Sequence, residues 1–211
     1  MNLIIDDSKI EELEKLIIEK FKEFRGLFKK TYKADIFGEL HKRHIDPIWT
    51  CYINGRGQGY KVENWEGIFP LWIKKYLPNK ATIIPESWYR IDYAVVDDSE
   101  GGWWEGKYQI FLIFEQENNP LEIKGHTRQF YDFNTPQKIL LTWTNDQYKD
   151  PKEILNWTDE TINYCKNKKI KNIGEIIIIV GDWEKLNKFY TEEKLKIEKP
   201  ILTYKHIPSE I

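Results

Sequence analysis

Hydrophobic residues recur at helical spacing near the start of the chain. Between residues 8 and 32, apolar positions lie three or four apart with polar residues between them, directly behind Asp7 and Ser8. This spacing predicts an amphipathic helix of about six turns. From residue 34 to residue 85 no period is sustained, so we expect a largely irregular insertion with short elements, among them a helix over 65–76.

From residue 88 onward the apolar pattern is typical of strands. Residues 89–96 and 108–114 are rich in β-branched and aromatic side chains, and the run Asp-Asp-Ser-Glu-Gly-Gly at 97–102 separates them. Such runs favour strands, and the residues between them favour a turn. The two segments therefore predict a β-hairpin.

The remainder alternates between helical and extended patterns. Asn119 and Pro120 form a helix start, a capping residue followed by proline, and this helix should reach about Phe133. The elements expected after it are strands over 138–143, 175–180 and 201–204 and a helix over 151–167. Residues 176–180 are all apolar, which is typical of a strand covered on both faces. The order predicts an α/β fold with a mixed sheet, an antiparallel hairpin plus parallel strands, flanked by helices.

Composition narrows the possible partners. Lys+Arg number 32 and Asp+Glu 34, so a polyanion would be recognised only at a local patch. The two cysteines, Cys51 and Cys165, are far apart in the sequence, which argues against a disulfide framework. The first residues lack a signal-peptide pattern, and the apolar run 176–180 is too short for a bilayer span of about 20 residues. We therefore expect a cytoplasmic protein with no membrane partner.

Three acids on the predicted hairpin are candidates for chemistry. If the turn centres near residues 102–104, facing residues have numbers that sum to about 205–207, which sets Asp92 opposite residues 113–115. Because side chains alternate along a strand, Glu115 and Glu117 share one face. Asp92, Glu115 and Glu117 are therefore expected to lie together.

Carboxylates that lie together repel one another unless a cation accompanies them. Like charges at close range raise pKa values and cost stability. Mg²⁺ prefers carboxylate and water oxygens, and a bound divalent ion can polarise a phosphoryl oxygen and activate water. The three acids thus predict a site for Mg²⁺ or Mn²⁺.

The order of elements and acids resembles the core of the PD-(D/E)XK nuclease superfamily. The shared pattern is a long helix, a strand with Asp, a hairpin, a strand ending Glu-x-Glu, a helix and a further strand. By this resemblance Asp92 corresponds to the aspartate of the motif, Glu115 to its second acid and Glu117 to the position usually held by lysine. No proline precedes Asp92, and Glu-x-Glu is the pattern of a minority of restriction enzymes. Residues 114–120 also resemble the Glu-His-Glu-Asn motif of a branch of prokaryotic proteins, with Gln116 in place of histidine.

The resemblance covers roughly residues 88–145, together with the first helix by topology. It implies a restriction-endonuclease-like mixed sheet in a single domain, 1–211. The nuclease-like core would be about residues 86–181 plus helix 8–32, and residues 34–85 would be an insertion.

The resemblance also implies a function. It indicates a metal-dependent nuclease that hydrolyses phosphodiester bonds, with DNA the favoured nucleic acid, of restriction or defence type, for which a homodimer would be natural. The lysine missing at position 117 needs a substitute. Lys124, His126 and Arg128 lie on the following helix, and Lys124 is the preferred catalytic candidate because it stands one turn from the start of that helix.

Other interpretations stay open at this point. Acids at strand ends are commonly solvated, and the absence of the lysine allows an inactive nuclease fold that binds nucleic acid without cutting it. A third possibility is a protein-interaction domain that meets its partner through tryptophans such as Trp103 and Trp104 at the hairpin turn.

Overall fold

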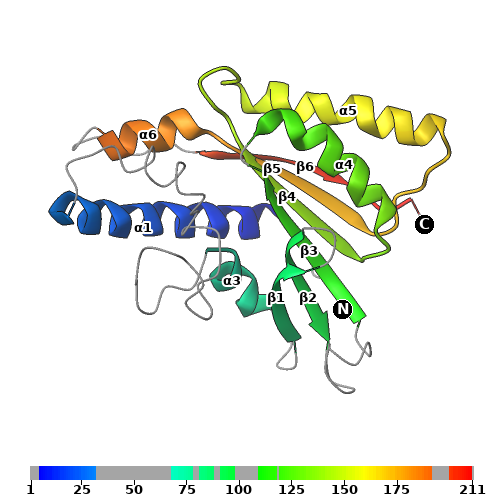
Figure 1. Ribbon diagram of the computed structural model, residues 1–211, viewed down its shortest axis with the longest axis horizontal. Coiled ribbons are helices and arrows are strands. Elements are labelled where there is room, and N and C mark those ends of the chain that lie inside the picture. Colours follow the sequence, from blue (N-terminus) through cyan, green and yellow to red (C-terminus); the bar gives the residue numbers. More distant parts are fainter. Residues whose placement is uncertain are drawn as a thin grey trace. The chain divides into compact units, whose positions relative to one another are not determined.

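A computed structural model of the protein describes residues 5–31, 68–77, 81–87, 91–97, 109–117, 119–191 and 200–210 (Figure 1). The chain divides into two compact units, one of residues 5–77 and one built mainly of residues 78–211. The hairpin turn with Trp103 and Trp104, and most of the predicted insertion, lie outside the described residues. Each unit is considered by itself, and the grouping of helix 8–32 with the nuclease-like core stays a prediction.

The smaller unit is helical. It contains α1 (Asp7–Thr31), α3 (Ile68–Ile73) and the 3-10 helix η1 (Lys74–Tyr76). Helix α1 confirms the amphipathic helix expected from the sequence, and it begins where the Asp6 carboxylate accepts hydrogen bonds from Ser8 Oγ and Lys9 N. Ile10, Leu13 and Ile17 of α1 are buried, and Trp72 of α3 donates its indole N–H to the Lys9 carbonyl at 2.9 Å.

The larger unit is built on one six-stranded sheet with strand order β1-β2-β3-β4-β5-β6. The strands are β1 (Ala81–Ser87), β2 (Ile91–Asp97), β3 (Gln109–Glu117), β4 (Gln137–Trp143), β5 (Glu175–Gly181) and β6 (Leu202–Ile207). Strands β1 to β3 are antiparallel, β3 to β5 are parallel, and β6 is antiparallel to β5. This arrangement confirms the α/β class, the hairpin, the parallel strands and the edge strand near residue 201.

Strand β1 is one of two elements that the sequence pattern did not predict, the other being the helix over Trp183–Thr191. It pairs with β2 along nearly its whole length, although Pro85 lies within it. Proline cannot donate to a ladder, so it argues against a central strand, but an edge strand tolerates it. The sheet therefore begins inside the segment 34–85 that was expected to be an insertion, and it extends past residue 181 to β6.

In the larger unit, each of the strands β3, β4 and β5 is followed by a helix. These helices are α4 (Ile123–Asp132), which continues the 3-10 turn η3 (Pro120–Glu122), α5 (Pro151–Asn167) and α6 (Trp183–Thr191). Helices α4 and α5 connect the parallel strands and lie side by side over one face of the sheet (Figure 1). Helix α5 matches the predicted range 151–167, with Asp150 as its cap and Pro151 in its first turn.

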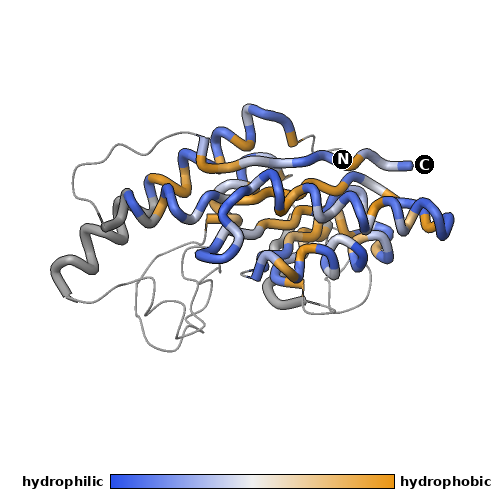
Figure 2. Tube along the Cα trace, turned by 90° about the horizontal axis from the view of Figure 1, so that it is seen from above, coloured by the Kyte–Doolittle hydropathy of each residue, from blue (hydrophilic) through white to orange (hydrophobic). Residues whose placement is uncertain are grey.

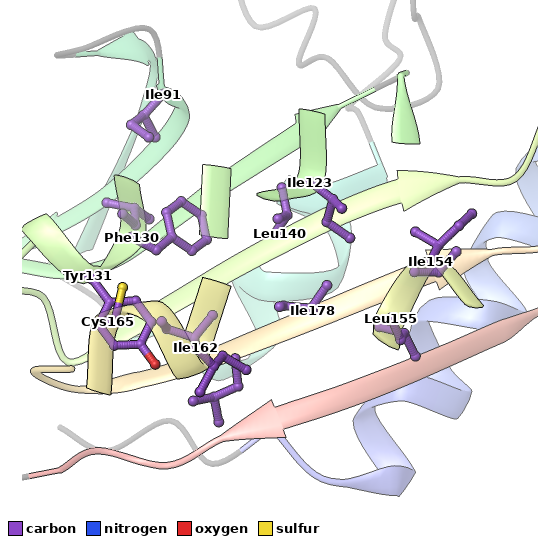
Figure 3. Close-up of a cluster of buried hydrophobic side chains, with 14 of the residues drawn as sticks. Ile91, Ile123, Phe130, Tyr131, Leu140, Ile154, Leu155, Ile162, Cys165 and Ile178 are labelled. Atoms are coloured by element: carbon purple, nitrogen blue, oxygen red, sulfur yellow. The ribbon is translucent and has the colours of Figure 1, made fainter. Parts of the chain in front are cut away.

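The core of the larger unit lies between α4, α5 and the sheet. Phe130 of α4 and Ile162 of α5 lie against the strand residues Leu140 and Ile178, and all four are buried (Figure 3). Figure 2 shows helices on which hydrophobic and hydrophilic residues alternate, beside strands that are largely hydrophobic. Residues 176–180 of β5 are buried at every position, which confirms the expectation that this strand is covered on both faces. None of the described helices is long and apolar enough to cross a membrane.

Substitution of two glycines, Gly174 and Gly125, tests the packing of the larger unit. Gly174 precedes β5 with φ +79°, and a Cβ there would strike the backbone carbonyl oxygens of Thr135 and Pro136. We expect Gly174→Ala to lower the free energy of unfolding by about 2 kcal/mol or more. An alanine is strained at this positive φ, and its Cβ would force the backbone of the neighbouring segment to move. Urea denaturation followed by circular dichroism measures the change.

Gly125 provides the matched control. It lies inside α4 with open space where a Cβ would be, so Gly125→Ala should raise the free energy of unfolding by about 0.5–1 kcal/mol. Equal effects of the two substitutions would contradict the described path of the chain at Gly174.

Candidate functional site

The register of β2 and β3 brings two of the predicted acids together. Tyr93 pairs with Phe114 and Ala94 with Ile113, so facing residue numbers sum to 207, as the hairpin arithmetic predicted. Asp92 and Glu115 stand one residue beyond this pairing, at the end of the ladder. The sequence therefore placed these two acids correctly relative to each other.

Each of these acids binds the backbone of the opposite strand. The Asp92 N–H donates to Glu115 Oε2 at 3.0 Å, and the Gln116 N–H donates to Asp92 Oδ2 at 2.7 Å. At this end of the ladder, side-chain carboxylates thus take the place of backbone carbonyls as acceptors. The two carboxylates are held in fixed positions beside each other, because a carboxylate bound to a backbone N–H cannot rotate freely.

The acids lie on the face of the sheet that α4 and α5 cover. Ala94 and Ile113 belong to the core beneath these helices, and Asp92 and Glu115 are two residues away on the same strands. Alternation therefore places both acids, and Glu117 as well, on that face. The Glu115 side chain is 8% exposed, whereas the Glu117 side chain is 22% exposed.

The turn from β3 into α4 is organised by polar side chains. Glu117 Oε1 accepts the Asn119 N–H at 2.7 Å, and Asn119 Oδ1 accepts the Leu121 N–H at 3.2 Å. The predicted cap at Asn119 is confirmed, but the first turn is the 3-10 helix η3 and α4 itself begins at Ile123. The start of α4 thus follows the end of β3 after only a few residues.

His126 of α4 is a basic side chain that faces two of the acids, Glu115 and Glu117. Its Nε2 lies 3.0 Å from Glu117 Oε2, and its Nδ1 lies 3.7 Å from Glu115 Oε1. The first distance is that of a hydrogen bond, and the second is a charge contact without one. The imidazole therefore lies between the two glutamates of the Glu-x-Glu pattern.

Lys124, the residue preferred from the sequence, has a different partner. Its Nζ forms an ion pair with Glu160 Oε2 of α5 at 2.5 Å, and among the described contacts none joins it to the three acids. Arg128 pairs with Asp132 on its own helix at 2.7 Å. Of the three basic residues named from the sequence, the structure brings only His126 to the acids.

Helical spacing alone does not distinguish His126 from Lys124. Ile123 and Phe130, both fully buried, lie three residues before and four residues after His126. Thr127, also fully buried, lies three residues after Lys124. Residues three or four apart share one side of a helix, so both side chains border the buried side of α4, and the packing of the helix decides which of them reaches the acids.

Burial and charge shift the pKa values within this group. Burial, and next the negative charge of Asp92, raise the pKa of Glu115 to about 7. The hydrogen bond to Glu117, followed by the charge of Glu115, raises the pKa of His126, against the opposing effect of burial. A proton or a cation is thus favoured beside Glu115 at neutral pH.

The fit of a metal ion depends on how many protein ligands it needs. Within the ranges that the structure describes, no three side chains of His, Cys, Asp or Glu are placed so that they could hold one ion. Mg²⁺ usually keeps several waters and takes only one or two carboxylates together with substrate phosphates. Asp92 and Glu115 suit an ion of this kind, and the described residues do not form an all-protein cage.

The pKa of Glu115 predicts how stability depends on pH. The folded pKa, about 7, lies above the ordinary value of 4.5, so the folded protein binds more protons between these values than the unfolded chain. The stability contributed by protonated Glu115 is therefore complete below about pH 4.5 and is lost as pH rises to about 7. We expect the substitution Glu115→Gln to remove this loss, and the free energy of unfolding of the variant relative to wild type to rise by up to about 3 kcal/mol from pH 4.5 to pH 8.

Urea denaturation at several pH values in the presence of a chelator measures this difference. Glu153→Gln, which removes one acid from an exposed position of α5, is the matched control and should not reproduce the rise expected for Glu115→Gln. A parallel pH dependence of wild type and Glu115→Gln would show that Glu115 ionises normally.

The comparisons with known proteins add no relative to this picture. No family model, no curated protein and no solved structure matches the chain. Function is therefore inferred from the residues and contacts of this chain.

Proposed function

We propose that the protein is a metal-dependent nuclease that hydrolyses phosphodiester bonds and has a restriction-endonuclease-like core. The observation that carries the proposal is the pair Asp92 and Glu115, fixed side by side at the end of β2 and β3, with the pKa of Glu115 raised to about 7 by burial and by Asp92. Two such carboxylates gain most from a divalent cation beside them.

The order of elements supports the same proposal. The acids lie on two strands of an antiparallel hairpin, and β3 continues through α4 into a parallel strand, β4. A long helix, α1, precedes these elements in the chain. This order is similar to that of the superfamily that the sequence resembles, in which Asp92 and Glu115 would correspond to the two acids.

In this proposal Asp92 and Glu115 hold Mg²⁺ or Mn²⁺, and the substrate is a nucleic acid, DNA by resemblance. The ion would supply charge stabilisation at the phosphoryl group and an activated water. The residues of this chain orient the ligands and set their surroundings. The backbone N–H groups of Asp92 and Gln116 orient the two carboxylates. Glu115 lies in a buried environment of low dielectric constant, in which charges interact strongly.

A specific observation supports a second candidate function. The described residues contain no ready-made group of three metal ligands, and His126 already lies between Glu115 and Glu117. Both facts suit a catalytically inactive nuclease fold that binds nucleic acid without a metal. The two functions differ in their response to metal, which makes them separable by one experiment.

We expect Mn²⁺ to bind in isothermal titration calorimetry, and plasmid DNA to be cleaved with Mg²⁺ or Mn²⁺. Asp92→Asn should lower both metal affinity and cleavage by more than about 100-fold, since even residues that only support a metal ligand commonly cost about 10–100-fold. The asparagine keeps the shape of Asp92 but removes its charge.

Glu153→Gln again serves as the control and should behave as wild type in both assays, because it removes one acid from an exposed position on α5. Nucleic-acid binding that ignores a chelator, without cleavage and without Mn²⁺ binding, would overturn the enzyme proposal in favour of the binding module.

A further inference from the structure

Glu117 differs from the other two acids in what its oxygens bind. Its Oε1 accepts the Asn119 N–H at 2.7 Å and its Oε2 lies 3.0 Å from His126 Nε2. A carboxylate only accepts hydrogen bonds, so His126 Nε2 is the donor. Both oxygens of Glu117 are thus engaged by groups of the chain itself, one at the entry to α4 and one on its second turn.

The other side of the same imidazole is turned to Glu115. His126 Nδ1 lies 3.7 Å from Glu115 Oε1, is buried, and makes no hydrogen bond within the described residues. Glu115 Oε2 is meanwhile occupied by the Asp92 N–H. The position of the imidazole ring therefore determines whether a nitrogen lies beside Glu115 Oε1. The hydrogen bond from His126 Nε2 to Glu117 in turn fixes the position of the ring.

We propose that Glu117 and His126 form a clamp that positions Glu115 for the metal. Glu117 is then a positioning residue and not the metal ligand that the sequence pattern had predicted it to be. This inference rests on the proposed nuclease function, since it concerns the same site. The clamp joins the last residue of β3 to α4 across the tight turn at Asn119. A hydrogen bond from His126 Nε2 to a carboxylate is directional, which suits it to fix a ring orientation.

The clamp also accounts for a glutamate at position 117, where the resembled pattern usually has lysine. An acid at residue 117 cannot itself place a nitrogen beside Glu115, but by binding His126 Nε2 it brings Nδ1 of the same ring there. Lys124, whose Nζ pairs with Glu160, does not provide that nitrogen. The substitute for the missing lysine is therefore a pair of residues, one on β3 and one on α4.

The first test is Mn²⁺ affinity measured by calorimetry on the full chain. We expect His126→Ala to weaken binding by about 10–100-fold, the usual effect of removing a group that supports a metal ligand. His126→Gln should not restore the affinity, because its amide nitrogen reaches as far as Nε2 and can donate to Glu117 but leaves no nitrogen beside Glu115. His126→Asn should not restore it either, because its amide reaches only the position of Nδ1 and leaves Glu117 without its donor. Recovery of wild-type affinity in either variant would contradict the clamp.

Arg128→Ala is the matched control on the same helix. It breaks only the partly exposed pair with Asp132 and should change the affinity by no more than about two-fold. An equal loss in Arg128→Ala and His126→Ala would mean that α4 has merely been loosened. A larger loss of cleavage in Lys124→Ala than in His126→Ala would return the substitute role to the lysine.

A double-mutant cycle separates a clamp from an independent ligand. If Glu117 acts through His126, the double variant Glu117→Ala, His126→Ala should bind Mn²⁺ no more weakly than the weaker single variant, because each change removes the same hydrogen bond. If Glu117 coordinates the ion directly, the two losses should multiply, and the clamp is then wrong.

The outcome for the clamp can be read apart from the outcome for the proposed function. Mn²⁺ binding that is lost in Asp92→Asn but unchanged in His126→Ala would overturn the clamp and leave the nuclease proposal standing. A wild-type protein that binds no Mn²⁺ would overturn both. In the metal-free protein, nitrogen-detected NMR of the imidazole should show the Nε2 signal shift in Glu117→Gln, and an unchanged signal would exclude the hydrogen bond itself.

Discussion

The register between β2 and β3 is the constraint on which the candidate site depends. A slip of one residue would turn every side chain of a strand to the opposite face of the sheet. Ala94 and Ile113 pair within the core under α4 and α5, so burial of these apolar residues fixes the register. The same pairing carries Asp92 and Glu115 into contact two residues further along. Hydrophobic packing thus sets the positions of the two charged groups.

Burying a carboxylate beside another is unfavourable, and the surrounding structure shows how the cost is offset. The backbone N–H groups of Asp92 and Gln116 each bind one of the two acids, and His126 approaches from above. The pKa of Glu115 nevertheless stays near 7, because desolvation and the charge of Asp92 outweigh these contacts. The ionised form of Glu115 therefore remains unfavourable in the folded state, and a bound cation would stabilise it. This is the physical basis of the proposed function.

Helix α4 connects the fold to the chemistry of the site. Its buried side, with Ile123 and Phe130, anchors it on the sheet, and the turn at Asn119 sets where it begins. His126 lies on this anchored side, so the packing that holds the helix also holds the imidazole against Glu115 and Glu117. Residues that stabilise the core and residues that serve the site are therefore contributed by the same few turns.

The sequence by itself determined the elements with strong periodicity, namely α1, α5, the hairpin and the buried strand β5. It also determined that Asp92 faces Glu115, because strand register and alternation follow from local geometry. It did not reveal β1, since Pro85 conceals an edge strand, and it chose Lys124 over His126. Only the tertiary structure decided that choice: which residue of a helix reaches a neighbouring strand depends on how the helix packs, and the contacts among Glu115, Glu117 and His126 join elements whose relative placement no local pattern encodes.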